Sequence, residues 1–269
     1  MNFAALMGTF LGIAVTAFAI LTSTQNPAVF ADVHGIVIVI GGTVTVALLC
    51  FPFLRLLSAV RIVARKVFGR EKIDYLGTIQ TIVQLSQIYR VDPKKALESI
   101  PPKSHPFLRD GMQLLVDYGF SQEELDSVLS NALRGKKKRD DEEVKVWHTV
   151  ARFPPAFGLL GATVGMISLL QTLGEPGAQD RIGPAMATAL VATFYGLTVA
   201  NFLLIPLAEK LSSVSKEDGI MRSIILEGVL MIQEKRHPVY IEEYLKSFLA
   251  PKYRNLDLSS DNSKDQKAA

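Results

Sequence analysis

Four long apolar segments alternate with charged segments along this chain of 269 residues. Residues 2–31, 35–54, 153–174 and 182–208 contain no Asp, Glu, Lys or Arg. A helix of about 20 apolar residues is long enough to cross about 30 Å of hydrocarbon. The pattern therefore predicts four membrane-spanning helices. The first is expected to stay uncleaved, because no basic residue precedes it and a second span follows it.

The charged segments have helical periodicity. Apolar residues recur at helical spacing between residues 73 and 89 and again after the fourth span, between residues 207 and 232. Asp92 before Pro93 predicts the start of a short helix over 93–100, because Asp caps free N–H groups and Pro fits the first helical position. A further helix is expected to begin near Phe107.

The stretch Ser121-Gln122-Glu123-Glu124 is a capping box, which predicts a helix from there to about Leu133. No alternating strand pattern competes with the helices, so the predicted fold is an all-α membrane protein with a large helical insertion between spans two and three and a long helical extension after span four. The predicted organisation is transmembrane helices one and two in 1–54, a cytoplasmic helical domain in 55–151, transmembrane helices three and four in 152–208, cytoplasmic C-terminal helices in 209–255 and a disordered tail in 256–269.

Basic residues predict the orientation of the spans. Residues 55–72 carry six Lys and Arg, whereas the short connections 23–34 and 174–182 hold only Asp32, Glu175, Asp180 and Arg181. The positive-inside rule places both termini and the insertion in the cytoplasm. Mean hydropathy of +0.26 and 49% hydrophobic residues fit a membrane protein, and the net charge of +3 gives no reason to expect nucleic-acid binding.

Two smaller features have ordinary explanations. The basic run GKKKR (135–139) is followed at once by DDEE (140–143), which is typical of a solvated helix face. The single cysteine, Cys50, has no second cysteine to pair with and is expected to be a packing residue. The four histidines are scattered through the sequence and are expected at the surface or at the membrane boundary.

The third and fourth spans contain small residues at spacings that let two helices approach closely. These helix-packing residues are Gly158, Gly161, Gly165, Ala189 and Gly196. Prolines mark the cytoplasmic end of both spans. Pro154 and Pro155 suit the start of a helix, whereas Pro206 lies inside a helical run, where it frees the carbonyl of Phe202 and bends the helix.

None of the four spans contains Asp, Glu, Lys, Arg or His. A proton or ion pump that works alone needs an ionisable group at membrane depth. If this chain conducts ions, a second chain must therefore supply the carboxylate.

Several motifs resemble those of the MotA/PomA flagellar stator subunits, members of the MotA/TolQ/ExbB group. They occur in the same order and cover nearly the whole chain: IVIVIGGTVTVALLCFPF, LLVDYG, FPPAFGLLGATVGMI, GPAMATALVATFYGLTVANFLLIPLAEKL and IILEGVLMIQEKRHP. The resemblance implies a torque generator of the bacterial inner membrane, in which five copies surround a dimer of the single-span partner MotB or PomB and form an ion channel that converts ion flow into rotor torque. That partner carries the membrane aspartate that is missing here.

The resemblance also implies roles for individual residues. Pro155 in PPAFG and Pro206 in IPLAEK match the prolines that couple ion passage to movement. Arg90 and Glu98 in YRVDPKKALE match the charged pair that faces the rotor protein FliG, although here the sequence 92–95 between them departs from the common pattern. Exposed charge pairs add little stability, but arrays of them can register one protein against another.

The coupling ion is expected to be the proton, with sodium as the alternative. Thr193 matches a threonine near the partner's aspartate, and Ala162 occupies the position where sodium-driven members have threonine. A hydroxyl oxygen is a ligand for a hard cation, which a proton does not need. Thr163 points about 100° away around the helix.

No P-loop, metal-ligand cluster or catalytic constellation is present in the sequence, so neither enzymatic activity nor a cofactor is expected. Two alternatives remain open. One is a TolQ/ExbB-like protein that uses the proton-motive force to energise outer-membrane processes, although that type has three spans. The other is a membrane scaffold that conducts nothing and in which the prolines serve only as bends.

Overall fold

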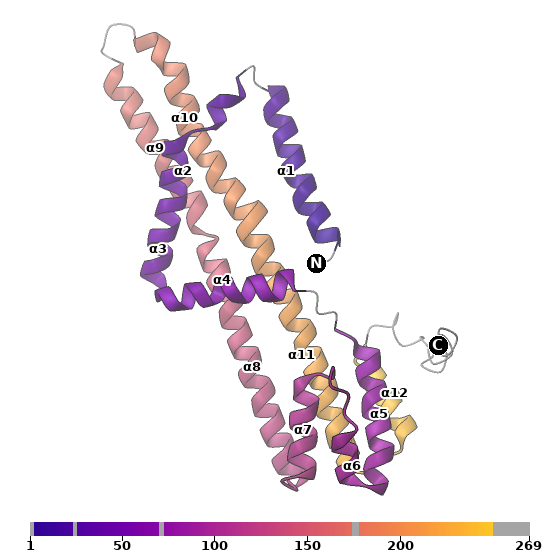
Figure 1. Ribbon diagram of the computed structural model, residues 1–269. Coiled ribbons are helices and arrows are strands. Elements are labelled where there is room, and N and C mark those ends of the chain that lie inside the picture. The colour runs from indigo at the N-terminus through magenta and orange to yellow at the C-terminus, as the bar shows by residue number, and fades with distance from the viewer. Residues whose placement is uncertain (1–2, 24–25, 70–72, 174–177, 250–269) are drawn as a thin grey trace. The chain divides into compact units, whose positions relative to one another are not determined.

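The computed structural model describes residues 3–23, 26–69, 73–173 and 178–249 (Figure 1). Every described element is a helix, which confirms the predicted all-α fold for this part of the chain. The chain divides into two compact units, one formed by residues 1–70 and 140–214 and the other by 71–139 and 215–269. The predicted tail 256–269 and Glu175 in the connection 174–182 lie outside the described residues.

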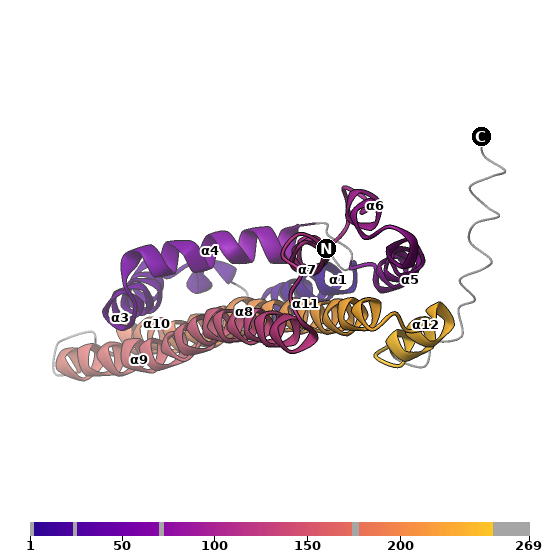
Figure 2. The same cartoon turned by 90° about the horizontal axis from the view of Figure 1, so that it is seen from below.

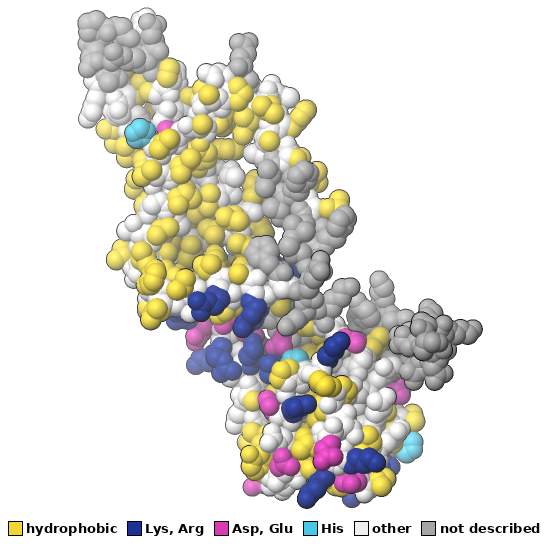
Figure 3. Space-filling view, viewed as in Figure 1, with side chains coloured by type: hydrophobic (Ala, Val, Ile, Leu, Met, Phe, Trp, Pro, Cys, Tyr) yellow, Lys and Arg dark blue, Asp and Glu magenta, His cyan; other side chains and the backbone are white. Residues whose placement is uncertain are grey.

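The first unit holds the apolar helices. Its elements are α1 (Phe3–Ser23), the 3₁₀-helix η1 (Pro27–Phe30), α2 (Val33–Ile36), the π-helix η2 (Val37–Gly41), α3 (Gly42–Cys50), α4 (Phe53–Phe68), α9 (Phe153–Thr172), α10 (Ala178–Thr198) and the π-helix η3 (Val199–Leu204), with the second part of α8 (Gln122–Val150) and the first part of α11 (Ile205–Gln233). Helices α9 and α10 lie side by side and antiparallel in both ribbon views (Figures 1 and 2). Apolar side chains cover much of this unit's surface in Figure 3.

Three helical runs among the described residues are long and apolar enough to cross a membrane: Pro27–Cys50, Gln122–Gln171 and Ile182–Gln233. The second and third are too long to lie wholly in a bilayer, and their charged residues up to Arg152 and from Glu209 onward mark the parts outside it. Helix α1 is 21 residues long and carries no charged residue, but the apolar stretch for which the structure describes every side chain, Ala14–Ser23, is shorter than a span. A span formed by α1 therefore stays a prediction.

The second apolar run ends earlier than its uncharged sequence suggests. The helix stops at Cys50, because Phe51 is extended (φ −136°, ψ 141°) and Pro52 follows it. The residue before a proline is disfavoured in the helical region, and proline has no N–H to continue the ladder. A separate helix, α4, starts at Phe53 and runs across the direction of α3 in Figure 1.

The second unit has its own hydrophobic core. Its elements are α5 (Tyr75–Val91), α6 (Pro93–Glu98), α7 (Pro106–Val116), α12 (Pro238–Lys246) and the remaining parts of α8 and α11. The largest fully buried side chains of this core are Ile79, Ile82, Leu85, Leu108, Met112, Leu125, Leu129, Ile224, Ile225, Ile232 and Ile241. They come from every helix of the unit except the short α6, which contributes the buried Ala96.

The predicted helix starts are confirmed by their caps. Asp92 accepts hydrogen bonds from the N–H groups of Lys94 (3.0 Å) and Lys95 (3.2 Å). The Glu124 carboxylate accepts a hydrogen bond from the backbone N–H of Ser121 at 2.9 Å, which completes the capping box of α8.

The predicted end of helix α8 near Leu133 is wrong. Helix α8 continues to Val150, because the charged run 135–143 consists mostly of residues with good helix propensity.

Candidate functional site

The hairpin of α9 and α10 is closed by contacts between small residues. An added Cβ would lie 2.9 Å from the Ala192 carbonyl oxygen at Gly158, and 2.8 Å from the Cβ of Ala189 at Gly165. At Gly161 it would lie 2.8 Å from the Cβ of Ala192. The two backbones thus approach more closely than side chains would allow, which is how spanning helices associate without a hydrophobic driving force.

Gly196 brings α10 against the prolines that begin α9. A Cβ on Gly196 would lie 2.4 Å from the carbonyl oxygen of Pro154 and 3.1 Å from the Cα of Pro155. Pro154 is buried and Pro155 half-buried, and both occupy the first turn of α9. The structure therefore places Pro155 beside the tightest contact of the hairpin, which is between Gly196 and the carbonyl group of Pro154.

Hydroxyl groups on the hairpin are held by backbone carbonyls. The Thr193 hydroxyl donates to the Gly158 carbonyl oxygen across the two helices at 3.3 Å, and its own oxygen keeps free lone pairs. Thr163 is exposed, and its hydroxyl donates to the Leu160 carbonyl oxygen of the same helix at 2.7 Å. Ala162 is half-buried and brings no polar atom to its position.

Pro206 directly follows an irregular part of the helix. The preceding segment, η3, is π-helical, and the Ile205 N–H donates to the Ala200 carbonyl oxygen five residues back instead of four. Proline cannot donate at all, so the regular ladder is broken at two consecutive positions. Such π-bulges cause bends and are frequent at functional sites. Sequence reasoning identified the proline but not the π-helix, which has no sequence signal of its own.

The charged pair Arg90 and Glu98 lies in the second unit, at the end of α5 and on α6, and both side chains are exposed. They differ in their contacts. The Arg90 guanidinium donates to the carbonyl oxygens of Lys235 (2.7 Å) and Arg236 (2.6 Å), just beyond the end of α11. No hydrogen bond or ion pair of the Glu98 side chain is found among the described residues.

The end of α11 explains why it attracts Arg90. The Lys235 N–H donates to the Ile232 carbonyl and the Arg236 N–H to the Met231 carbonyl, and Lys235 has φ +53°. This is a Schellman motif with lysine where glycine is usual. The carbonyl groups beyond it have no helical partner, and a guanidinium satisfies two of them.

The charged run of α8 is not wholly solvated, contrary to expectation. Asp140 is buried, and its carboxylate accepts from the Lys66 ammonium of α4 at 2.8 Å, while Glu143 lies 3.4 Å from the same nitrogen. Burial favours the neutral amine, but the hydrogen bond and the charges of Asp140 and Glu143 outweigh it and raise the pKa of Lys66. A sequence signal existed: Asp140 shares a helix face with Val144 and Trp147, which are spaced by four and three residues.

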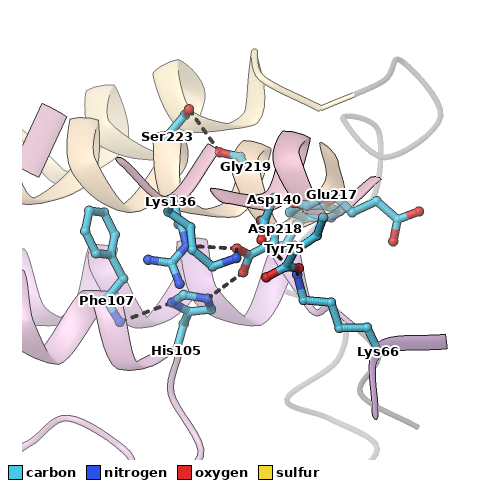
Figure 4. A network of polar contacts seen from close by, with 12 residues as sticks. Lys66, Tyr75, His105, Phe107, Lys136, Asp140, Glu217, Asp218, Gly219 and Ser223 are labelled. Carbon is cyan, nitrogen blue, oxygen red and sulfur yellow. Dashed lines mark hydrogen bonds and ion pairs between the residues drawn. The ribbon is translucent and has the colours of Figure 1, made fainter. Parts of the chain in front are cut away.

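A second polar cluster joins α8, the start of α7 and α11 in the second unit (Figure 4). The Asp218 carboxylate lies 3.1 Å from Nε2 of His105 and 2.9 Å from Nε of Arg222, with Lys136 at 3.8 Å. Burial opposes ionisation of Asp218, but these partners outweigh it, and its pKa lies well below the usual range. His105 also caps α7 and is half-buried, so it keeps part of its expected surface exposure while its ring contacts Asp218.

These features define a class: a helical membrane protein with a tightly packed hairpin of two apolar helices, which has no acidic or basic side chain within 153–172 or 182–204, joined to a helical domain with its own core. Residues 101–224 match the MotA/TolQ/ExbB proton channel family. The chemotaxis protein PomA of Vibrio alginolyticus is 31% identical over 96% of this chain and 99% of its own. Motility protein A of Aquifex aeolicus is 30% identical over 88% of this chain and 94% of its own.

The fold is also that of a solved structure. A chain in the structure of C. jejuni MotAB superposes with a TM-score of 0.83 at 22% identity, over 93% of this chain and 97% of that chain. The chain belongs to the MotA/TolQ/ExbB proton channel family and is a flagellar stator subunit of the MotA/PomA type. The resemblance seen in its motifs is thereby confirmed, and as a channel component the chain is not an enzyme.

Proposed function

We propose that this subunit combines with a single-span MotB/PomB-type partner in the bacterial inner membrane and converts proton flow into torque on the rotor protein FliG. In this proposal four spans cross the membrane, α1 included, and both termini lie in the cytoplasm. Five copies surround a partner dimer.

One observation carries the proposal. The close-packed hairpin of α9, α10 and η3 has no Asp, Glu, Lys, Arg or His between Phe153 and Thr172 or between Ile182 and Leu204. Ions that cross a bilayer beside such a hairpin need an ionisable group from another chain. A membrane carboxylate on the partner meets this need, and the hairpin then supplies packing surfaces and a bend.

The proposed coupling elements lie at the cytoplasmic end of the hairpin. Pro155 sits against Gly196, and Pro206 follows the π-helix η3. Protonation of the partner's aspartate removes its charge and changes which surface of the hairpin it favours. One elementary charge that falls through 100 mV releases about 2.3 kcal/mol. That free energy is comparable to the few kcal/mol that separate two conformations of a protein.

Protons are the proposed ion because the described hairpin offers few ligands for a metal cation. Sodium is a hard cation and needs several oxygen ligands. The Thr193 hydroxyl is near the hairpin seam, but Ala162 adds no oxygen, and the Thr163 hydroxyl is bound to its own helix. Removal of sodium from the medium is therefore expected to leave rotation unchanged, and a protonophore to stop it. Rotation that stops without sodium but continues with a protonophore would instead identify sodium as the coupling ion.

Arg90 and Glu98 are proposed to face the rotor. The Glu98 side chain is exposed, so its carboxylate is accessible to a charged group on the rotor. Arg90 is exposed too, but it also holds the backbone at the end of α11. We therefore expect a substitution at Glu98 to affect rotor contact alone. A substitution at Arg90 should affect both rotor contact and the local stability of the second unit.

The test is the rotation of tethered cells that lack this gene and any second stator set, with flagella confirmed by microscopy. The wild-type gene is expected to restore rotation. Pro206→Ala is expected to assemble normally but to give little torque, because alanine restores the missing N–H and removes a cause of the bend. Pro184→Ala, in the same helical run but away from η3, is the matched control and is expected to rotate. Full rotation by Pro206→Ala would reject the coupling role and favour the scaffold alternative.

A further inference from the structure

Helix α4 of the first unit has one face that is already occupied. Ala59 and Val63 are each only 4% exposed, and Val63 packs in a small cluster with Leu211, Trp147 and neighbouring apolar residues. The ion pair from Lys66 to Asp140 reinforces this face. Helix α4 is therefore fixed to the parts of α8 and α11 that belong to the same unit.

A second face of α4 is apolar and exposed, and nothing in the described part of the chain covers it. Phe53, Leu57 and Val60 are 65%, 47% and 55% exposed, and Ala64 continues the stripe at the spacing of one helix face. An exposed stripe of this kind on a helix that runs across the spans is typical of a helix lying in the membrane interface. The apolar side chains of such a helix enter about 5–10 Å into the boundary between headgroups and acyl chains.

A third face, next to the apolar stripe, is basic. Arg61 and Arg65 are exposed and four residues apart, so they share one side of the helix. The other cations of α4 have acidic partners, since Arg55 pairs with Glu142 at 3.1 Å and Lys66 with Asp140. Within the described part of the chain, Arg61 and Arg65 have no ion pair.

We propose that Arg61 and Arg65 bind the headgroup phosphates of anionic phospholipids in the cytoplasmic leaflet. Positions 61 and 65 lie about 70° and 110° around the helix from the middle of the apolar stripe, which puts their guanidinium groups at the level of the phosphates when the stripe is inserted. Guanidinium groups match phosphate oxygens in a bidentate geometry. The choice of leaflet rests on the orientation in the proposed function.

The experiment uses the purified complex of this chain with its partner. Native mass spectrometry would follow titration with phosphatidylglycerol and, separately, phosphatidylethanolamine of identical acyl chains. The variants are Arg61→Gln/Arg65→Gln and the charge-conserving Arg61→Lys/Arg65→Lys. The matched control, Lys103→Gln/Arg109→Gln, removes two exposed positive charges from the second unit.

Each basic residue near an anionic surface contributes about fivefold in binding, so the double Gln variant is expected to bind phosphatidylglycerol about 25-fold more weakly. The control should keep the wild-type preference, and the lysine variant should bind phosphatidylglycerol with an affinity between those of wild type and the double Gln variant, because it keeps the charge and loses the bidentate geometry. Equal binding of both lipids by the wild-type complex would overturn the proposal, and so would an unchanged preference in the double Gln variant. If the subunits of the double Gln variant came apart in the presence of either lipid, the proposal would also be overturned. The two arginines would then be assigned to a contact between chains.

The readout separates this proposal from the proposed function. A complex that binds phosphatidylglycerol through Arg61 and Arg65 but turns no motor would reject the stator mechanism alone. A motor that rotates without any lipid preference would reject the lipid site alone.

Discussion

Replacement of Gly196 by alanine tests the tightest contact of the hairpin. The new Cβ would lie 2.4 Å from the carbonyl oxygen of Pro154, 3.0 Å from its carbonyl carbon and 3.1 Å from the Cα of Pro155. All three are backbone atoms, so no rotation of a side chain relieves the overlap. The two helices must separate by about 1 Å to reach ordinary van der Waals contact.

The cost follows from packing and propensity. Overpacking in a well-packed core costs about 1–3 kcal/mol, and alanine returns up to about 1 kcal/mol because it favours the helix more than glycine does. We expect Gly196→Ala to lower the free energy of unfolding by about 1–2 kcal/mol. It also displaces Pro155, so torque should fall by more than the loss of assembled protein explains.

The assays are thermal unfolding of the purified complex and rotation of tethered cells at matched protein levels. Gly41→Ala is the control, because a Cβ there meets no atom of the described chain within 4 Å. The control should unfold at the wild-type temperature or above it. If Gly196→Ala unfolded like the control and rotated normally, the helices would not be in the close contact described, and the coupling argument based on it would fail.

Three further predictions concern the second unit. Lys235→Gly should raise the free energy of unfolding by about 0.5–1 kcal/mol, because glycine adopts a positive φ without strain, and thermal unfolding would show this. Asp218→Ala should lower it by about 2 kcal/mol at pH 7. Because the pKa of Asp218 is lowered on folding, its ionised form stabilises the protein above about pH 4, and this stabilisation is lost as the pH falls further. The free energies of unfolding of wild type and variant should therefore converge as the pH is lowered below about 4. A difference that stays constant with pH would count against the role of the cluster. Arg90→Ala should cost about 1 kcal/mol through the lost carbonyl contacts, whereas Glu98→Ala should leave stability unchanged and reduce only torque; equal unfolding temperatures for the two variants would contradict this difference.

Some local features followed from sequence because they depend on neighbours in the chain. The cap of Asp92 on α6 and the capping box at Ser121 are contacts within three residues, and both are present as predicted. The end of α8 was misjudged, because propensity sets a weak preference for continuing a helix and packing decides where it stops. The break at Pro52 was missed, since the absence of charge continues past it to Leu54 although the helix does not.

Composition and periodicity along the chain were sufficient to establish the membrane class, the helical fold, the family motifs and the lack of acidic or basic residues in the apolar segments. These properties depend on composition and on the 3.6-residue period, which act along the chain. The packing of helices that are distant in the chain brought Gly196 to Pro154, Lys66 to the buried Asp140 and Arg90 to the end of α11. Those pairs are separated by 42 to 145 residues, and their meeting depends on how whole helices pack, which no local pattern records.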